Sequence, residues 1–272
     1  MKTFQPIAIV GIGGIFPNAP TLDAFWQHIE RGVSAARDVP NGRWPLPLAE
    51  IYHPQRGLID HVYSKRGCYI TEFALDAAGL RLDPALIAQL DPVFHLALHA
   101  ARAALHDANL TEAERRAAGV MLGNIALPTE TMSAMTAEML GQVFENAVLQ
   151  TSEVLKTSEV FRVNPMNRHA VGMVAGITAQ SFGLGGGSFT VDGACAASLY
   201  ALNFAALELQ AGRADAMLSG GVCRPDSAFT QMGFCQLGAL SPTGTCSPFD
   251  AKNDGLVVGE GAGVFVLKRL DD

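Results

Sequence analysis

The hydrophobic residues along the chain predict short buried strands that alternate with helices. Residues 7–11, IAIVG, form a β-branched apolar run ended by glycine, which is typical of a buried strand. The segments GVMLG at 119–123, SFTV at 188–191 and ADAMLSGGV at 214–222 have the same character. A final strand pair is expected around LVVGEGAGVFVLKRL, residues 256–270. Strands of this length between helices indicate an α/β architecture.

Capping residues mark where two of the helices begin. Thr21 precedes LDAFWQHIERG, and Asp91 precedes a proline that opens a helix running to about Asn109. Both side chains can accept hydrogen bonds from the free N–H groups of a first helical turn, and proline is favoured at the first position.

Further helices are expected over residues 129–150 and from about Arg168 to Phe182. Residues 33–90 are rich in proline, glycine and charge, and this predicts excursions over the surface. No segment has the character of a linker between two domains, so residues 1–272 are interpreted as one region.

Composition narrows the classes of function. Of 272 residues, 49% are hydrophobic and 17% are charged, which indicates a folded chain. Acidic residues outnumber basic ones by 26 to 19, which argues against a surface for nucleic acid or anionic membranes. No apolar run reaches the roughly 18 residues of a membrane span. The N-terminus has a lysine and an apolar run, but Pro6 and three glycines favour a strand and turn over a signal peptide.

The five cysteines are scattered and odd in number, without a CxxC pair or zinc-ligand spacing. We therefore expect no disulfide framework and no metal site, and a reducing, cytoplasmic setting. His95, His99 and His106 fall on one face of a predicted helix. No carboxylate or cysteine completes a ligand set there, so a helix surface or helix contact is favoured over a metal pair.

Three glycines after the first strand suggest a dinucleotide-binding loop, and the spacing rejects it. Gly11, Gly13 and Gly14 are followed by Phe16 where the GxGxxG pattern needs its third glycine. Pro17 and the residue after it continue a loop instead of opening a helix.

The segment from residue 188 to 210 carries the main chemical candidate, Cys195. The cysteine follows SFTV and begins a helix, predicted to end at Gln210, that is apolar on nearly every face and so is expected to lie buried at the centre of the fold. A thiol at a helix N-terminus gains up to about 2 kcal/mol from the dipole, which would lower its pKa from about 8.5 to near 7. Small neighbours, among them Gly193 and Ala196, would let an acyl group approach. The alternative is that Cys195 is a small buried hydrophobe.

A thiol hydrolase is disfavoured by the order of residues. The strand, turn, nucleophile and helix resemble the nucleophile elbow of α/β-hydrolases, whose histidine follows the nucleophile. All seven histidines precede Cys195, which also removes a papain-like order. A caspase-like order stays open, without its local signature.

Three segments, VDGACAASLYAL, PIAIVGIGGIFPNAPTLDAFW and LSPTGTCSPFDAKNDGLVVGEGAGVFVLKRL, resemble the β-ketoacyl synthase family. The resemblance runs in order from about residue 6 to 271. It implies a thiolase-like fold: a layered α/β/α arrangement with a mixed sheet, built from two similar halves and paired as a dimer. Residues 1–272 would be the N-terminal domain with its connecting strands, and the C-terminal half would be absent.

The resemblance assigns roles to individual residues. Cys195 matches the acyl-accepting cysteine, and its backbone N–H matches one donor of the oxyanion hole. Phe234, in FCQLGALS, matches the aromatic residue that lines the acyl pocket. The FDxxxDG and GEGA segments are interpreted as structural turns, and their matching positions are Asp250, Asp254, Gly255, Gly259 and Glu260.

The implied activity is that of a condensing enzyme in fatty acid or polyketide synthesis. Cys195 would accept an acyl chain from the phosphopantetheine of an acyl carrier protein for decarboxylative Claisen condensation. The chain would need no cofactor or metal of its own. Its expected partners are the carrier protein, the remainder of a multidomain synthase and a second copy of itself. The divergent middle, from His61 to Leu105, looks closer to iterative polyunsaturated-fatty-acid or polyketide types.

Two departures from the family pattern qualify this activity. Ala196 and Ala197 replace serines, which preserves small size. The two catalytic histidines and the lysine of the family lie in a later portion, which the chain does not reach by Asp272. We therefore expect acylation of Cys195 without condensation by the 272-residue chain alone. The alternatives are a structural or dimerisation fragment, and a thiolase-type acyltransferase acting on coenzyme A esters.

Overall fold

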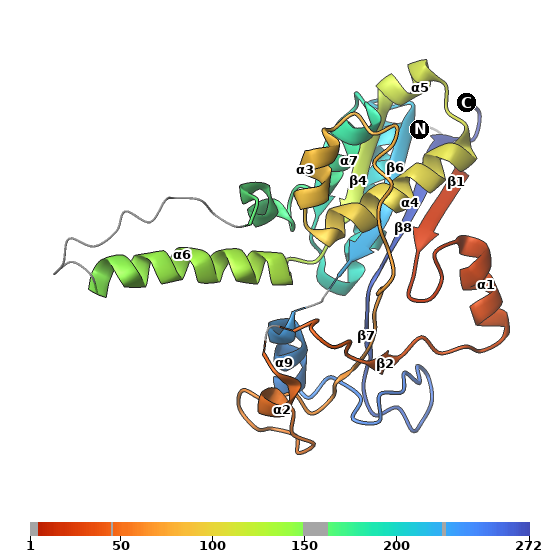
Figure 1. The fold of residues 1–272 in the computed structure, drawn as a ribbon. Helices are drawn as coiled ribbons and strands as arrows, with labels where there is room; N and C mark the ends of the chain where they lie inside the picture. The colour runs from red at the N-terminus through yellow and green to blue at the C-terminus, as the bar shows by residue number, and fades with distance from the viewer. Residues whose placement is uncertain (1–4, 45, 149–162, 225–226) are drawn as a thin grey trace.

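The computed structural model describes residues 5–44, 46–148, 163–224 and 227–272. Strands and helices alternate along most of this length (Figure 1). The strands are β1 Ile7–Ile15, β2 Arg37–Asp38, β3 Arg66–Cys68, β4 Ala118–Gly123, β5 Ser188–Val191, β6 Ala216–Cys223, β7 Val258–Gly259 and β8 Gly261–Arg269. The α-helices are α1 Leu22–Glu30, α2 Leu48–Ile51, α3 Pro84–Gln89, α4 Pro92–Ala108, α5 Glu112–Ala117, α6 Glu130–Val148, α7 Val174–Phe182, α8 Ala197–Gln210 and α9 Ala228–Gln236, and short 3₁₀ turns cover Pro165–His169 and Ala194–Ala196.

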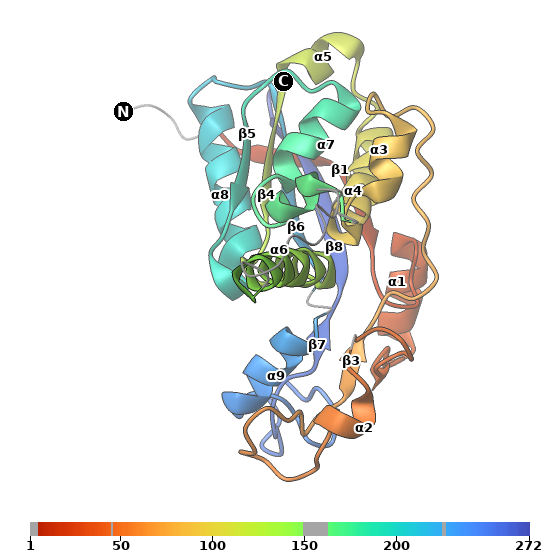
Figure 2. The same ribbon diagram turned by 60° about the vertical axis from the view of Figure 1, so that its left-hand side comes forward.

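The main sheet is mixed, with strand order β1-β8-β6-β4-β5. Strand β4 pairs in parallel with both β5 and β6, whereas β8 is antiparallel to β6 and to β1. Helices α4 and α7 cover one face, and α8 lies on the other (Figure 2). The predicted layered α/β/α arrangement with a mixed sheet is therefore confirmed.

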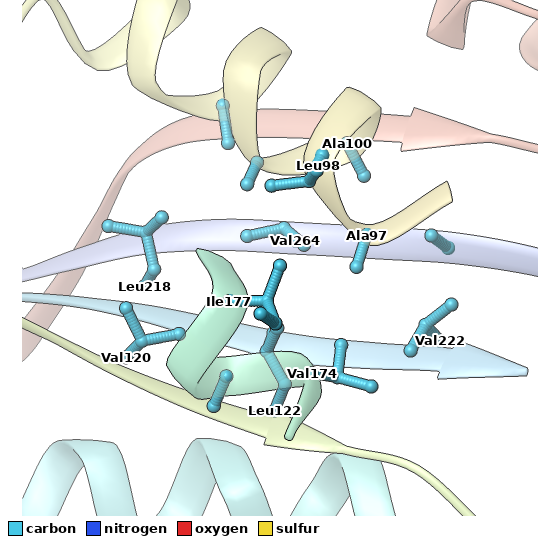
Figure 3. Packing of buried hydrophobic residues seen from close by; sticks show 14 of the residues in the cluster. Ala97, Leu98, Ala100, Val120, Leu122, Val174, Ile177, Leu218, Val222 and Val264 are labelled. Atoms are coloured by element: carbon cyan, nitrogen blue, oxygen red, sulfur yellow. The ribbon is translucent and has the colours of Figure 1, made fainter. Parts of the chain in front are cut away.

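Helix α4 supplies most of the hydrophobic core on its face of the sheet. Asp91 accepts a hydrogen bond from the Val93 N–H at 2.9 Å, and Asn109 ends the helix in the left-handed conformation, so both predicted ends are confirmed. The labelled side chains of α4 and α7 point toward those of β4, β6 and β8 (Figure 3). The fully buried set includes Leu98, Ala100, Val120, Leu122, Leu218 and Val266.

Strand β1 is longer than the predicted run 7–11, because its glycines serve packing instead of a turn. A Cβ atom placed on Gly11 would lie 2.4 Å from the Ala104 carbonyl oxygen of α4, so only glycine allows this approach. The strand continues to Ile15, with a register irregularity between Ile9 and Gly11.

A second, three-stranded sheet of order β2-β3-β7 lies beside the main one. Helices α2 and α9 lie beside it (Figure 1). Together these elements enclose a smaller core. That core includes Trp44, Ile51, Val62, Tyr63 and Leu240. The prediction that residues 33–90 only run over the surface is therefore wrong in part, because isolated apolar residues in this stretch pack against a segment distant in sequence.

One predicted helix is interrupted in the structure, and another forms as expected over its described residues. The segment from Arg168 to Phe182 is not continuous: a 3₁₀ turn, Pro165–His169, is separated from α7, which begins at Val174. Gly172, exposed between them, disfavours helix. The predicted helix over 129–150 forms as α6, Glu130–Val148, which extends away from the body (Figure 1), and residues 149 and 150 lie outside the described residues.

The predicted final strand pair divides between the two sheets. Strand β7 has two residues and pairs with β3, whereas β8 has nine and lies between β1 and β6 in the main sheet. The connection between them brings the two sheets together at Glu260, whose N–H donates to the Cys68 carbonyl at 2.9 Å.

Histidines of α4 contact neighbouring segments. The Nε2 atoms of His95 and His99 lie 2.7 and 3.4 Å from the carbonyl oxygens of Ile87 and Pro20. Burial lowers the pKa of His99. The helix-contact interpretation is thus confirmed for these two residues. Within the ranges that the structure describes, none of the helices has the length and apolar character required to span a bilayer.

Candidate active site

Cys195 lies at the predicted junction of strand and helix, but in a turn before the helix and not in its first turn. Strand β5 ends at Val191, the thiol belongs to the 3₁₀ turn Ala194–Ala196, and α8 begins two residues later at Ala197. The cysteine side chain is exposed. The sulfur is therefore accessible to a ligand.

Asp192 holds this turn, a role that was not predicted from the sequence. One carboxylate oxygen accepts from the Ala194 N–H at 2.8 Å, and the other accepts from the Ala126 N–H at 3.1 Å. Ala194 has φ of +50°, a left-handed conformation that is unfavourable for alanine. Asp192 thus stabilises the strained residue next to Cys195 and fixes the loop after β4 against it.

Asn124, directly after β4, ties the same loop to the segment before α7. Its side-chain amide donates to the carbonyl oxygens of Ala170 and Val171, each at 3.1 Å, and its N–H donates to the Val191 carbonyl. Asn124 and Asp192 could have been found from their positions in the sequence. Each follows directly after a parallel strand, and ligands bind at the carboxyl ends of such strands.

Glycines let the start of α8 approach the strands closely. A Cβ atom on Gly123 would lie 2.5 Å from the Ala197 carbonyl carbon, and one on Gly221 would lie 2.9 Å from the Ser198 Cβ atom. Neither position tolerates a side chain without displacing the helix. The helix N-terminus is therefore held at the ends of β4 and β6.

The helix itself is only half covered, so the prediction that it lies buried at the centre of the fold is wrong for this chain. Ala197, Ala201, Ala205 and Leu209 are buried against the sheet. The opposite side exposes apolar side chains: Leu199 by 68%, Tyr200 by 50%, Phe204 by 40% and Leu207 by 46%. The physical reason is that no described element packs on this outer side of α8.

A cavity of about 610 Å³ opens at Cys195. Phe234, on α9, lines the same cavity, so the structure brings together the two predicted site residues. The walls are mainly apolar and small, and they include Ile125, Leu127, Leu202, Val222, Gly261 and Phe265. This volume and lining suit an apolar chain whose reactive end lies at the thiol.

Asp250, Asp254 and Gly255 form turns, as interpreted from the sequence. The Asp250 carboxylate accepts from the Lys252 N–H at 2.8 Å, and Asp254 accepts from the Thr243 hydroxyl at 2.8 Å. Hydroxyl hydrogen bonds hold the pKa of Asp254 below its ordinary value. Gly255 has φ of +142° beside the Leu240 backbone.

Glu260 is more than a turn residue. Its side chain is 2% exposed, lines the cavity and accepts hydrogen bonds from Arg43 and from the Ile70 N–H, the latter at 2.8 Å. Arg224 lies 3.8 Å from the same carboxylate. One buried carboxylate thus links the wall of the cavity to the small sheet.

Comparison with known proteins places the chain among condensing enzymes. The family model described as "Beta-ketoacyl synthase, N-terminal domain" matches residues 4–272. A phenolphthiocerol/phthiocerol polyketide synthase of Mycobacterium tuberculosis is 31% identical over 98% of this chain and 14% of the relative. A polyunsaturated fatty acid synthase of Thraustochytrium sp. is 28% identical over 98% of this chain and 10% of the relative. The chain therefore spans only a small part of these proteins.

Solved structures show the same fold. A PfaC keto synthase-chain length factor matches with a TM-score of 0.87 and 32% identity, over 98% of this chain and 30% of that one. The oxazolomycin ketosynthase domain OzmH KS7 of Streptomyces albus matches with a TM-score of 0.77 and 26% identity, over 98% of this chain and 42% of that one. The thiolase-like fold expected from the sequence is confirmed.

Proposed function

This chain belongs to the β-ketoacyl synthase family, and on that premise we propose that it carries the acyl-accepting site of a ketosynthase, with Cys195 as the nucleophile. The observation that supports this most strongly is the exposed Cys195 thiol at the mouth of a cavity of about 610 Å³ that Phe234 also lines. The proposed donor is the phosphopantetheine thioester of an acyl carrier protein.

In the proposed first step, the Cys195 sulfur attacks the carbonyl carbon of the carrier-bound thioester. The Cys195 N–H donates to the carbonyl oxygen as negative charge develops on it. The carbon–sulfur bond to phosphopantetheine then breaks, and the released thiol takes up the proton that Cys195 gave up. One thioester replaces another, so the step needs no redox cofactor and no metal.

Condensation itself is proposed to require a second half-domain. Loss of carbon dioxide from a malonyl thioester leaves an enolate, which needs hydrogen-bond donors of the kind that the family's histidines supply. The exposed apolar side of α8, with Leu199, Phe204 and Leu207, supports a further packing layer. The low coverage of the matched structures, 30% and 42%, agrees with this.

A homodimer is proposed as well. Strand β5 lies at an edge of the main sheet, and Phe189 on it is 54% exposed. An open edge of this kind can pair with a second copy. Light scattering of the purified chain would measure its mass, and a concentration-independent monomer would contradict this part of the proposal.

The acyl-transfer proposal is tested by the mass of the Cys195 peptide. The chain is incubated with an acyl-carrier-protein thioester or with the matching coenzyme A ester, digested and analysed. Acylation of Cys195 by the carrier-bound substrate is expected, absent in Cys195→Ala and kept in Cys246→Ser, whose thiol is also exposed. Preference for the coenzyme A ester would favour the thiolase-type alternative, and no mass change with either donor would favour a structural fragment.

A further inference from the structure

The cavity contains a second thiol that acyl transfer does not use. Cys223 is the last residue of β6 and is half-buried, and both it and the exposed Cys195 line the cavity. The remaining cysteines, Cys68, Cys235 and Cys246, do not line it.

The topology brings the two thiols to the same end of the sheet. Strands β5 and β6 run in the same direction, since both are parallel to β4, and α8 connects them. The helix must therefore run the opposite way, so its N-terminus lies beside the C-terminal end of β6.

One close contact shows that the segments carrying the two cysteines are neighbours. Gly221 packs so tightly against Ser198 that an added Cβ atom would lie 2.9 Å from the Ser198 Cβ atom. Cys223 lies two residues beyond Gly221, so its side chain projects from the same face of the strand. Cys195 lies about one helical turn before Ser198. Both cysteines thus extend in the same direction from a shared contact and into a shared cavity.

The two cysteines differ in exposure, which suits a first-oxidised thiol at Cys195 and a second, partner thiol at Cys223. Burial, together with the charges of Glu260 and Cys195, raises the pKa of Cys223 to about 11. Cys223 therefore stays protonated at neutral pH. Cys195 is exposed, and oxidation by small molecules follows exposure of the sulfur. An oxidant reaches Cys195 first, and Cys223 is the adjacent thiol.

We propose that Cys195 and Cys223 form a reversible intramolecular disulfide on exposure to a peroxide. This disulfide blocks the Cys195 thiol. The Cys195 sulfur attacks one peroxide oxygen, the O–O bond breaks, and a sulfenic acid and one water result. The Cys223 sulfur then attacks the sulfenic sulfur, the S–O bond breaks, and a second water leaves with the Cys223 proton. Two thiols are oxidised and one peroxide is reduced, and a dithiol reductant reverses the change by exchange.

Peptide mapping of the full chain tests this directly. The chain is treated with hydrogen peroxide, its remaining thiols are alkylated, and it is digested without reduction. We expect a linked pair of peptides containing Cys195 and Cys223, lighter by two hydrogen atoms than their sum and separated by dithiothreitol. Cys195 found as sulfinic acid, or linked to Cys246, with Cys223 alkylated, would overturn the proposal. The assay needs no acyl donor, so it is independent of the proposed function.

Matched variants sharpen the test by measuring recovery of the Cys195 thiol. After peroxide and then dithiothreitol, most of the Cys195 peptide should be alkylated by iodoacetamide in the unmodified chain and in Cys246→Ser. In Cys223→Ala, most of that signal should be lost, because the sulfenic acid has no partner and proceeds to the sulfinic acid. Full recovery in Cys223→Ala would contradict the proposal. If this variant does not fold, the map of the unmodified chain decides.

Discussion

On one face of the main sheet, α4 and α7 bury nearly all of their inward side chains, and on the other face α8 buries only one stripe. Phe94 and Leu98 of α4 are exposed by 1% and 0%, whereas Phe204 of α8 is exposed by 40%. The same strands support both layers, so the difference lies in what packs outside each helix. The face that carries Cys195 is the face with an exposed apolar stripe.

Matched phenylalanine truncations give the largest expected effect. Phe94→Ala should lower the free energy of unfolding by about 3–5 kcal/mol, because it opens a cavity in a fully packed core. Phe204→Ala should cost about 1 kcal/mol or less, because this ring already contacts solvent. Urea denaturation followed by circular dichroism measures both. Equal losses would show that the two faces do not differ in the way described.

A second pair tests the comparison within α8 alone. Leu209 is fully buried and Leu207 is 46% exposed. Leu209→Ala should lower the free energy of unfolding by about 2–5 kcal/mol, and Leu207→Ala by about 0.5 kcal/mol. The same denaturation experiment reports the difference. If Leu207→Ala were as costly as Leu209→Ala, something would already cover the outer side of α8.

Glycine substitutions compare the two faces through steric contact. In Gly123→Ala, the new methyl would meet the backbone of Ala197 and Ser198 at 2.5 Å, which should cost about 1–3 kcal/mol and displace Cys195. In Gly176→Ala, within α7, the methyl meets nothing within 4 Å, so a gain of about 0.4–1 kcal/mol is expected. Thermal denaturation shows whether each substitution raises or lowers the melting temperature. A stabilised Gly123→Ala would contradict the close approach of α8.

The smallest expected effect on stability comes from the charge of Glu114, which belongs to neither helical layer. Lys268 and Thr111 hold the pKa of Glu114 down at about 2, from an ordinary 4.5. A lowered pKa stabilises the fold above the unfolded-state value and loses that contribution as pH falls from about 4.5 toward 2. The advantage of the chain over Glu114→Gln should be below about 1 kcal/mol at pH 7, since the group contacts solvent. It should vanish near pH 2 in urea titrations, and an advantage that grew with acid would be the wrong sign.

Much of the fold is predictable from sequence wherever local chemistry decides it. Thr21, Asp91 and Asn109 act at helix ends through hydrogen bonds within a few residues, and each end was found where predicted. Strand β1 was predicted too short because Gly11 has two meanings in a sequence, a turn or a close contact, and only the position of α4 decides between them.

The candidate site was predictable to a different degree. Cys195 stands out because small neighbours and an apolar helix surround it, and its junction between strand and helix was found as expected. Asp192 and Glu260 were missed or undervalued, because their partners, the Ala126 N–H and Arg43, are brought near only by the fold. The exposed outer side of α8 was also not predicted. An apolar pattern shows that a helix can be buried, but it does not show which other elements pack against it.

The buried carboxylate of Glu260 affects how the cavity can change during evolution. It accepts hydrogen bonds from Arg43 and from the Ile70 N–H, which lie in the stretch between β1 and α3, and it also lines the cavity. A substitution in that distant segment can therefore displace the cavity wall without altering any residue that lines the cavity. Which ligands the cavity admits thus depends also on residues outside it.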